Sequence, residues 1–202
     1  MSVILEQSRS PHVKKWTKEE YLDLVERGVF RGQRVFLFRG DIIEIAPQGH
    51  PHAYAIMKLA RYLNNTYPEP FEIRMQLPFV TPGTTVPEPD AAVCSAEDAA
   101  RKPHPAHAEL AIEVAYSSID VDRELAEDYA AAGVPEYWIV DVDRRLIEVY
   151  RTPHPDPTAG FGHRYQQTLT RKNGEGTSPA NRPDAEIPVG GCLLQVSIRL
   201  PF

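Results

Sequence analysis

The chain has 202 residues, of which 42% are hydrophobic and 25% charged, as is typical of one globular domain. Its formal net charge of −6 argues against binding of nucleic acid through bulk electrostatics, but leaves room for an enzyme whose acidic cleft is neutralised by a metal ion. No apolar stretch is long enough to span a membrane and the N-terminus lacks a secretory pattern, so we expect a cytoplasmic protein. Cys94 and Cys192 lie far apart in apolar contexts, which favours buried free thiols.

The first third of the chain predicts two helices on either side of a hairpin. In "WTKEEYLDLVERG", Thr17 and Glu20 make a capping box and Gly28 suits the C-terminal end of a helix. The run "RVFLFRGDIIEI" predicts a hairpin that turns at residues 39–41. Apolar residues at helical spacing then predict a second helix from His52 to about Asn65.

The remainder predicts most of a sheet. Strands are expected at 71–80, 90–95 and 110–115, then a helix in "DRELAEDYAAAG" and a second hairpin at 136–141 and 146–150. Residues 151–185 predict a Pro/Gly-rich loop or arm interrupted by one strand, "HRYQQTL", and "CLLQVSIRL" predicts a closing strand. The expected fold class is α/β, a mixed β-sheet flanked by helices with an N-terminal helix and β-hairpin, in a single domain over residues 1–202.

Three acidic residues stand out by their positions. Asp90 begins an apolar strand directly after a proline-bracketed segment, and Glu113 lies in the middle of the apolar run "LAIEVA". Glu44 lies near the end of the first hairpin. If the two strands are neighbours, Asp90 and Glu113 face one crevice, where two or three carboxylates make a Mg²⁺ or Mn²⁺ site. Such an ion can bind a phosphate oxygen and lower the pKa of an attacking water.

Each of these residues also has an ordinary structural explanation. An Asp at the start of a strand is commonly a turn or cap residue, and Glu113 could face solvent or pair with an arginine. Glu44 alternates with two isoleucines, as on the exposed face of a hairpin. His50 and His52 resemble a pair of metal ligands, but "HPH" at the start of a helix is more typical of capping and surface positions.

The order of these motifs resembles a known family. "GDIIEIAP" with a following histidine, then "PEPDAAV", "LAIEVAYSS" and "YAAAGVPEYWIVD", resemble the Uma-type restriction endonucleases of the PD-(D/E)XK nuclease superfamily. The resemblance extends from about Trp16 to Tyr150. It implies a restriction-endonuclease-like fold and Mg²⁺- or Mn²⁺-dependent hydrolysis of DNA, with Asp90, Glu113 and Glu44 as the catalytic and metal-binding acids.

The chain departs from this pattern at the active-site lysine. The superfamily places a lysine two residues after the glutamate, where this chain has Ala115, and the family moves it to the next helix, near Leu125 and Ala126. Arg123 on that helix is the candidate that could donate charge to a phosphate, and Lys102 is a second candidate from the preceding loop.

Arg123 also has an alternative role on a solvated helix face. It could form an ion pair there with Glu124, Glu127 or Asp120. Tyr137 and Trp138 are expected on opposite faces of their strand, where either core packing or a dimer contact would explain them.

Three functions of different classes are therefore predicted. The first is a metal-dependent DNA endonuclease, impaired by the absence of the usual lysine. The second is a catalytically inactive nuclease-fold module that binds DNA or protein and acts as a homodimer. A third is an unrelated acid-lined hydrolase of another phosphoester. A homodimer is the expected assembly, and no membrane partner is expected.

Overall fold

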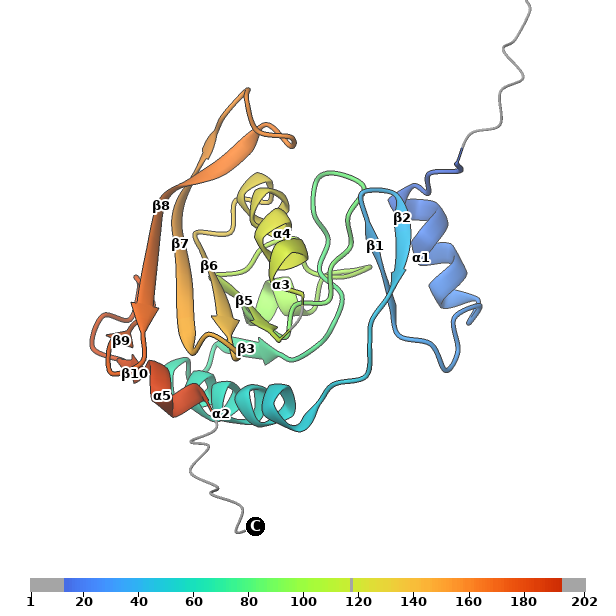
Figure 1. Cartoon of the computed structure of the whole chain (residues 1–202). Helices are drawn as coiled ribbons and strands as arrows, with labels where there is room; N and C mark the ends of the chain where they lie inside the picture. Colours follow the sequence, from blue (N-terminus) through green and yellow to red (C-terminus); the bar gives the residue numbers. More distant parts are fainter. Residues whose placement is uncertain (1–12, 117, 194–202) are drawn as a thin grey trace, which may run out of the picture.

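The computed structural model describes residues 13–116 and 118–193 (Figure 1). The main elements, in chain order, are α1 (Lys18–Glu26), β1 (Val35–Phe38), β2 (Asp41–Glu44), α2 (His50–Thr66), β3 (Phe71–Arg74), β4 (Ala91–Ser95), α3 (Ala96–Ala99), β5 (Leu110–Ala115), α4 (Ile119–Ala131), β6 (Glu136–Asp141), β7 (Leu146–Pro155) and β8 (His163–Lys172). Two short strands, β9 (Gly176–Thr177) and β10 (Ile187–Pro188), and the short helix α5 (Val189–Cys192) follow.

Six of the strands form one mixed sheet in the order β3-β4-β5-β6-β7-β8. Within this sheet β5 and β6 run parallel, and the other neighbouring pairs are antiparallel. Leu59 and Leu63 of α2 pack on one face, and Leu125 and Tyr129 of α4 pack on the other. Figure 1 shows the sheet between these two helices. The predicted α/β class with a helix-flanked mixed sheet is confirmed.

The β1–β2 hairpin lies beside this sheet rather than in it. Its turn residues Arg39 and Gly40 have φ values of 51° and 80°, the positive values that a tight hairpin turn requires. An isolated bridge joins Leu37 to Val86, in the segment that leads to β4. Arg39 also holds the hairpin to α4 and to the loop between β7 and β8. Its guanidinium donates to Glu124 Oε2 at 2.6 Å and lies over the ring of Phe161 in that loop at 4.5 Å. The hairpin is thus attached at its turn and at one backbone bridge.

The strand predicted at 71–80 is wrong beyond Arg74. Gln76 has a φ of 51°, which takes the chain out of the extended conformation. Its backbone N–H donates to Pro89 O at 3.1 Å, and its side chain reaches the start of the next strand. Residues 75–80 therefore form a connection that supports the beginning of β4.

The strand predicted in "HRYQQTL" is confirmed as β8, whereas the predicted loop before it is corrected. β7 continues to Pro155 and pairs with β8 from His163, so the first part of this segment is a long hairpin, which Figure 1 shows projecting from the sheet. β6 pairs with β7 only as far as Arg151, so the prolines beyond it lie where β7 has a partner strand on one side, a position that tolerates proline.

Other expectations concern the core and the C-terminal end. Tyr137 and Trp138 are both 0% exposed and belong to the cores on opposite faces of the sheet, so core packing is confirmed. Both cysteines are buried and free. A closing strand is expected to begin at Cys192, but Cys192 is the last residue of α5. Residues 194–200 of the predicted strand lie outside the described residues. None of the described helices combines the length and apolarity that a membrane span needs.

Shortening a buried side chain of α2 tests this packing. Leu59→Ala should lower the free energy of unfolding by about 3 kcal/mol, because Leu59 is 0% exposed against the sheet. Urea denaturation measures the change. Met57→Ala, at a 52% exposed position of the same helix, is the control and should change it by less than about 0.5 kcal/mol. Equal losses in the two variants would contradict this orientation of α2.

Candidate active site

The register of β4 and β5 brings Asp90 and Glu113 together. Ala91 lies opposite Ile112 in this antiparallel pair, so one residue further along Asp90 faces Glu113. Opposite residues of an antiparallel pair point to the same side of the sheet, here the side that α4 covers. The expected neighbourhood of the two strands is therefore confirmed.

The two carboxyl groups are held crosswise by the backbone. Asp90 Oδ2 accepts a hydrogen bond from Val114 N at 2.9 Å, and Glu113 Oε2 accepts one from Asp90 N at 3.2 Å. Gln76 Nε2 donates to Asp90 Oδ1 at 3.0 Å, and the Tyr129 hydroxyl donates to Glu113 Oε1 at 2.9 Å. Asp90 and Glu113 are only 8% and 7% exposed, so these hydrogen bonds replace most of their contact with water.

Both carboxyl groups line a pocket of about 350 Å³. Its walls come from the β1–β2 hairpin and the loop after it, the start of α2, the segment before β4, the end of β5 and the first turns of α4. Glu44, the last residue of β2, also lines this pocket and is exposed. The three acids predicted from the sequence thus line one pocket.

Asp122 adds a carboxyl group that the sequence did not single out. It lies in the first turns of α4, lines the same pocket and is 7% exposed. Its Oδ2 accepts a hydrogen bond from the Ser118 hydroxyl at 2.7 Å. The sequence predicts a helix that begins at Asp122, where an acidic residue is ordinary, whereas α4 begins at Ile119. The nine-residue spacing from Glu113 was the available signal.

His52 lies at the same pocket, whereas His50 does not line it. His52 Nε2 is 3.2 Å from Asp90 Oδ2. Its Nδ1 is buried and has no hydrogen-bond partner among the described residues. The "HPH" pattern therefore contains one surface histidine at the start of α2 and one that contacts a site carboxylate.

The electrostatics of the pocket disfavour several negative charges at once. Burial raises the pKa of Glu113 well above its ordinary value, and the neighbouring charges of Asp90 and Asp122 raise it further. Burial likewise raises the pKa of Asp122 to about 7, opposed by the Ser118 hydrogen bond and reinforced by Asp90. A cation in the pocket would relieve this repulsion.

The structure does not bring Arg123 to the pocket. Its guanidinium is bonded to the Glu148 carboxylate on β7, with Nε 3.1 Å from Oε2, and Nη1 is 3.9 Å from Asp120. The ion pair with Asp120 agrees with the alternative expected from the sequence, whereas Glu148 was not foreseen. Lys102 is exposed in the loop before β5 and does not line the pocket. Arg34 supplies the permanent positive charge among the described pocket-lining residues.

The donor set fits a hard divalent cation. Among the described residues no group of three or more His, Cys, Asp or Glu is arranged to hold a metal ion. Mg²⁺, however, is commonly bound by one or two carboxylates, with waters and substrate phosphates in the other positions. Two adjacent buried carboxylates whose charges repel each other meet that requirement.

A helix-flanked mixed sheet with acids converging at neighbouring strands defines a restriction-endonuclease-like fold. A model of the Uma2 family, described as "Putative restriction endonuclease", matches residues 18–188, and the chain belongs to this family. The fold is similar to the crystal structure of "a putative nuclease belonging to DUF820" from Anabaena variabilis ATCC 29413. The TM-score is 0.66 at 18% identity, covering 87% of this chain and 96% of that chain. No curated protein matches the chain.

The raised pKa of Asp122 predicts a pH-dependent cost in stability. The unfolded carboxyl ionises near pH 4 and the folded one near pH 7, so the folded state binds the extra proton between these values. Stability should therefore fall as pH rises from 4 to 7, by at most about 1.4 kcal/mol per pH unit from this group. Asp122→Asn should remove this loss, and its gain over the wild type should be largest above pH 7.

Urea denaturation at pH 4, 6 and 8 in EDTA measures the effect. Asp120→Asn is the control, because that side chain is 94% exposed on the same helix. A difference between Asp122→Asn and the wild type that is independent of pH would contradict the assigned titration.

Proposed function

We propose that the chain is a Mg²⁺- or Mn²⁺-dependent DNA endonuclease. The observation that carries the proposal is the crosswise placement of Asp90 and Glu113 on neighbouring strands at the floor of a pocket. Membership of a family described as a restriction endonuclease supports the same reaction class, hydrolysis of a phosphodiester. In this proposal Asp90 and Glu113 hold the ion, and Glu44 lines the same pocket.

When bound, the ion would lower the pKa of a water and offset the negative charge that develops on the phosphate. The residues of the chain prepare the site for it. Val114 N and Asp90 N orient the two carboxylates, and Tyr129 fixes the remaining oxygen of Glu113. His52, which contacts Asp90 at the pocket, is placed to orient this carboxylate or to exchange a proton with it.

The missing lysine favours Arg34 as the phosphate-binding cation. Arg34 is exposed at the pocket, so its guanidinium can turn toward an anion there. An arginine stays protonated and cannot serve as a base, so in this site it would bind and orient the phosphate. Arg123 would first have to leave Glu148, which makes its predicted role at the phosphate harder to realise.

A second function is a catalytically inactive module that binds DNA or protein as a homodimer. It is favoured by the absence of lysine among the described residues that line the pocket. The two functions differ in a measurable way. The inactive module keeps binding but shows no hydrolysis with any divalent ion. The endonuclease shows hydrolysis that depends on the two strand carboxylates.

Asp90→Asn and Glu113→Gln should each lower cleavage by about 100-fold, because each removes one charge that would hold the ion. The measurement is cleavage of plasmid and of a single-stranded circle in Mg²⁺ or Mn²⁺. Glu72→Gln, an exposed acid of β3, is the control and should leave the rate unchanged. Undiminished cleavage by both site variants would refute the site, and the absence of cleavage by the wild type would favour the inactive module.

Metal binding can be measured without DNA. Mn²⁺ at ten times its dissociation constant should raise the melting temperature by about 3 °C, because the ion binds the folded state alone. The increase should be absent in Asp90→Asn and kept in Glu72→Gln. An equal increase in all three proteins would place the bound ion elsewhere.

A further inference from the structure

The residues that line the pocket are of two kinds, and we call the apolar ones its apolar half. The pocket floor carries the carboxyl groups of Asp90, Glu113 and Asp122. The apolar half is formed by Phe36 and Ile43 of the hairpin, Pro87 before β4, and Val121 and Leu125 of α4. A hydrated ion and a phosphate are both polar, so binding them does not require these apolar side chains. A volume of about 350 Å³ also falls in the range of sites that enclose a small organic group.

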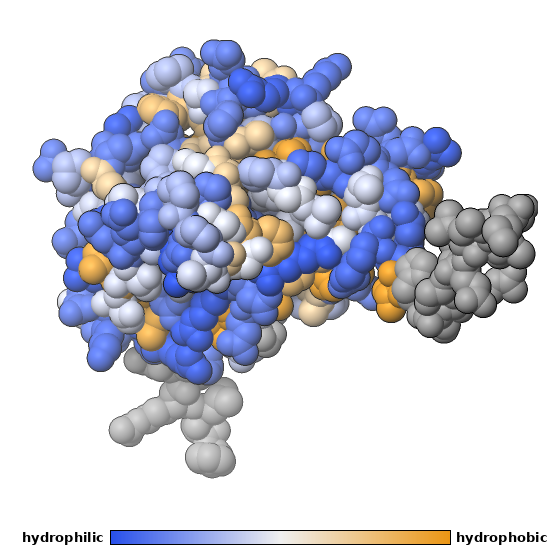
Figure 2. Space-filling model, turned by 90° about the horizontal axis from the view of Figure 1, so that it is seen from above, coloured by the Kyte–Doolittle hydropathy of each residue, from blue (hydrophilic) through white to orange (hydrophobic). Residues whose placement is uncertain are grey.

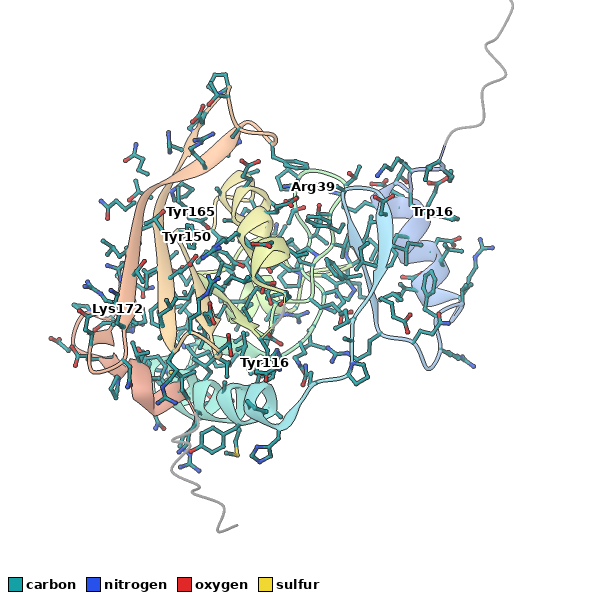
Figure 3. All side chains as sticks on the ribbon, viewed as in Figure 1. Trp16, Arg39, Tyr116, Tyr150, Tyr165 and Lys172 are labelled. Carbon is teal, nitrogen blue, oxygen red and sulfur yellow. The ribbon has the colours of Figure 1, made fainter. Side chains whose placement is uncertain are left out.

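Exposed hydrophobic side chains gather at the mouth of this pocket. Tyr116, Ile43 and Val121 line it and are 58%, 38% and 36% exposed. They are three of the eight large hydrophobic residues that are exposed in the described part of the chain. Figure 3 shows Tyr116 above the beginning of α2, just after the end of β5. Apolar side chains that cluster at the edge of a polar cavity commonly mark a ligand-binding site.

We propose that the apolar half holds the base of an unpaired nucleotide, with the Tyr116 ring stacking on it, so that the substrate is single-stranded DNA. This inference rests on the proposed phosphodiester hydrolysis. Asp90 and Glu113 are buried, so the phosphate must reach the floor and its nucleoside must enter the pocket. In a duplex both faces of a base are covered by neighbouring base pairs, whereas an unpaired base offers a face to an aromatic ring.

The charge distribution points the same way. A protein that tracks the backbone of a duplex neutralises several phosphates with Lys and Arg. Here the net charge is −6. Among the described residues that line the pocket, Arg34 is the single one that is a lysine or an arginine. With so little phosphate neutralisation, contact with the base has to supply much of the binding. Base–aromatic stacking can do so without regard to sequence.

The test measures binding rather than cleavage, in Ca²⁺, with a 15-nucleotide strand and the duplex of the same sequence. The wild type should bind the single strand at least about 10-fold more tightly than the duplex. Tyr116→Ala should weaken single-strand binding about 10-fold and leave duplex binding unchanged, while Tyr116→Phe keeps the ring and the affinity. Tyr54→Ala, which removes a tyrosine of α2 outside the pocket, is the control. A strand of equal length made of abasic residues should bind as weakly as the duplex.

The outcomes separate this inference from the proposed hydrolysis. Equal or tighter binding of the duplex, an equal effect of Tyr116→Ala on both DNAs, or no binding of either would overturn the base pocket. Preferential cleavage of duplex in Mg²⁺ would also overturn it while keeping the hydrolysis. Tyr116-dependent binding of the single strand without cleavage in Mg²⁺ or Mn²⁺ would reject the hydrolysis and leave the base pocket standing.

Discussion

Asp90 and Glu113 are buried opposite each other, where their charges repel and water scarcely reaches them. This pair constrains the positions of the surrounding elements. Each carboxyl group needs donors that the sheet itself cannot fully supply. Two come from the backbone of the facing strand, and the others come from Gln76 after β3 and Tyr129 on α4. His52 on α2 contacts Asp90 Oδ2 at 3.2 Å. Both flanking helices and the connection between β3 and β4 therefore meet at this pair.

The pair itself could be predicted because its signal is local. Glu113 has apolar neighbours on both sides in the chain, and few explanations other than a buried partner suit such a carboxylate. Most elements could be predicted for the same reason, since periodicity and caps depend on neighbouring residues. Asp122 and the Glu148 partner of Arg123 could not, because they depend on where α4 begins and on the strand it packs against. The apolar half of the pocket depends on the placement of a hairpin outside the sheet.

The carboxyl groups and the apolar residues of the pocket would have different roles in the proposed function: the first in hydrolysis and the second in binding the substrate. In the proposed reaction Arg34 would bind the phosphate but could not deprotonate a water. With no lysine among the described residues that line the pocket, that reaction would depend more on the ion and on the accuracy with which the substrate is positioned. A base held beside the carboxyl groups would contribute that accuracy. Figure 2 shows hydrophobic residues interspersed in a mainly hydrophilic face of the molecule.

The attachment of the hairpin has a consequence for the pocket. One wall of the pocket belongs to an element that shares no strand pairing with the six-stranded sheet. Its contacts include the Leu37–Val86 bridge, the hydrogen bond from Gly40 N to Thr84 O and the side chain of Arg39. The position of this wall therefore depends on contacts other than those that set the pairing of β4 with β5 and the spacing of the two carboxylates. Arg39, which does not line the pocket, thus contributes to the placement of the wall without contacting the two carboxylates.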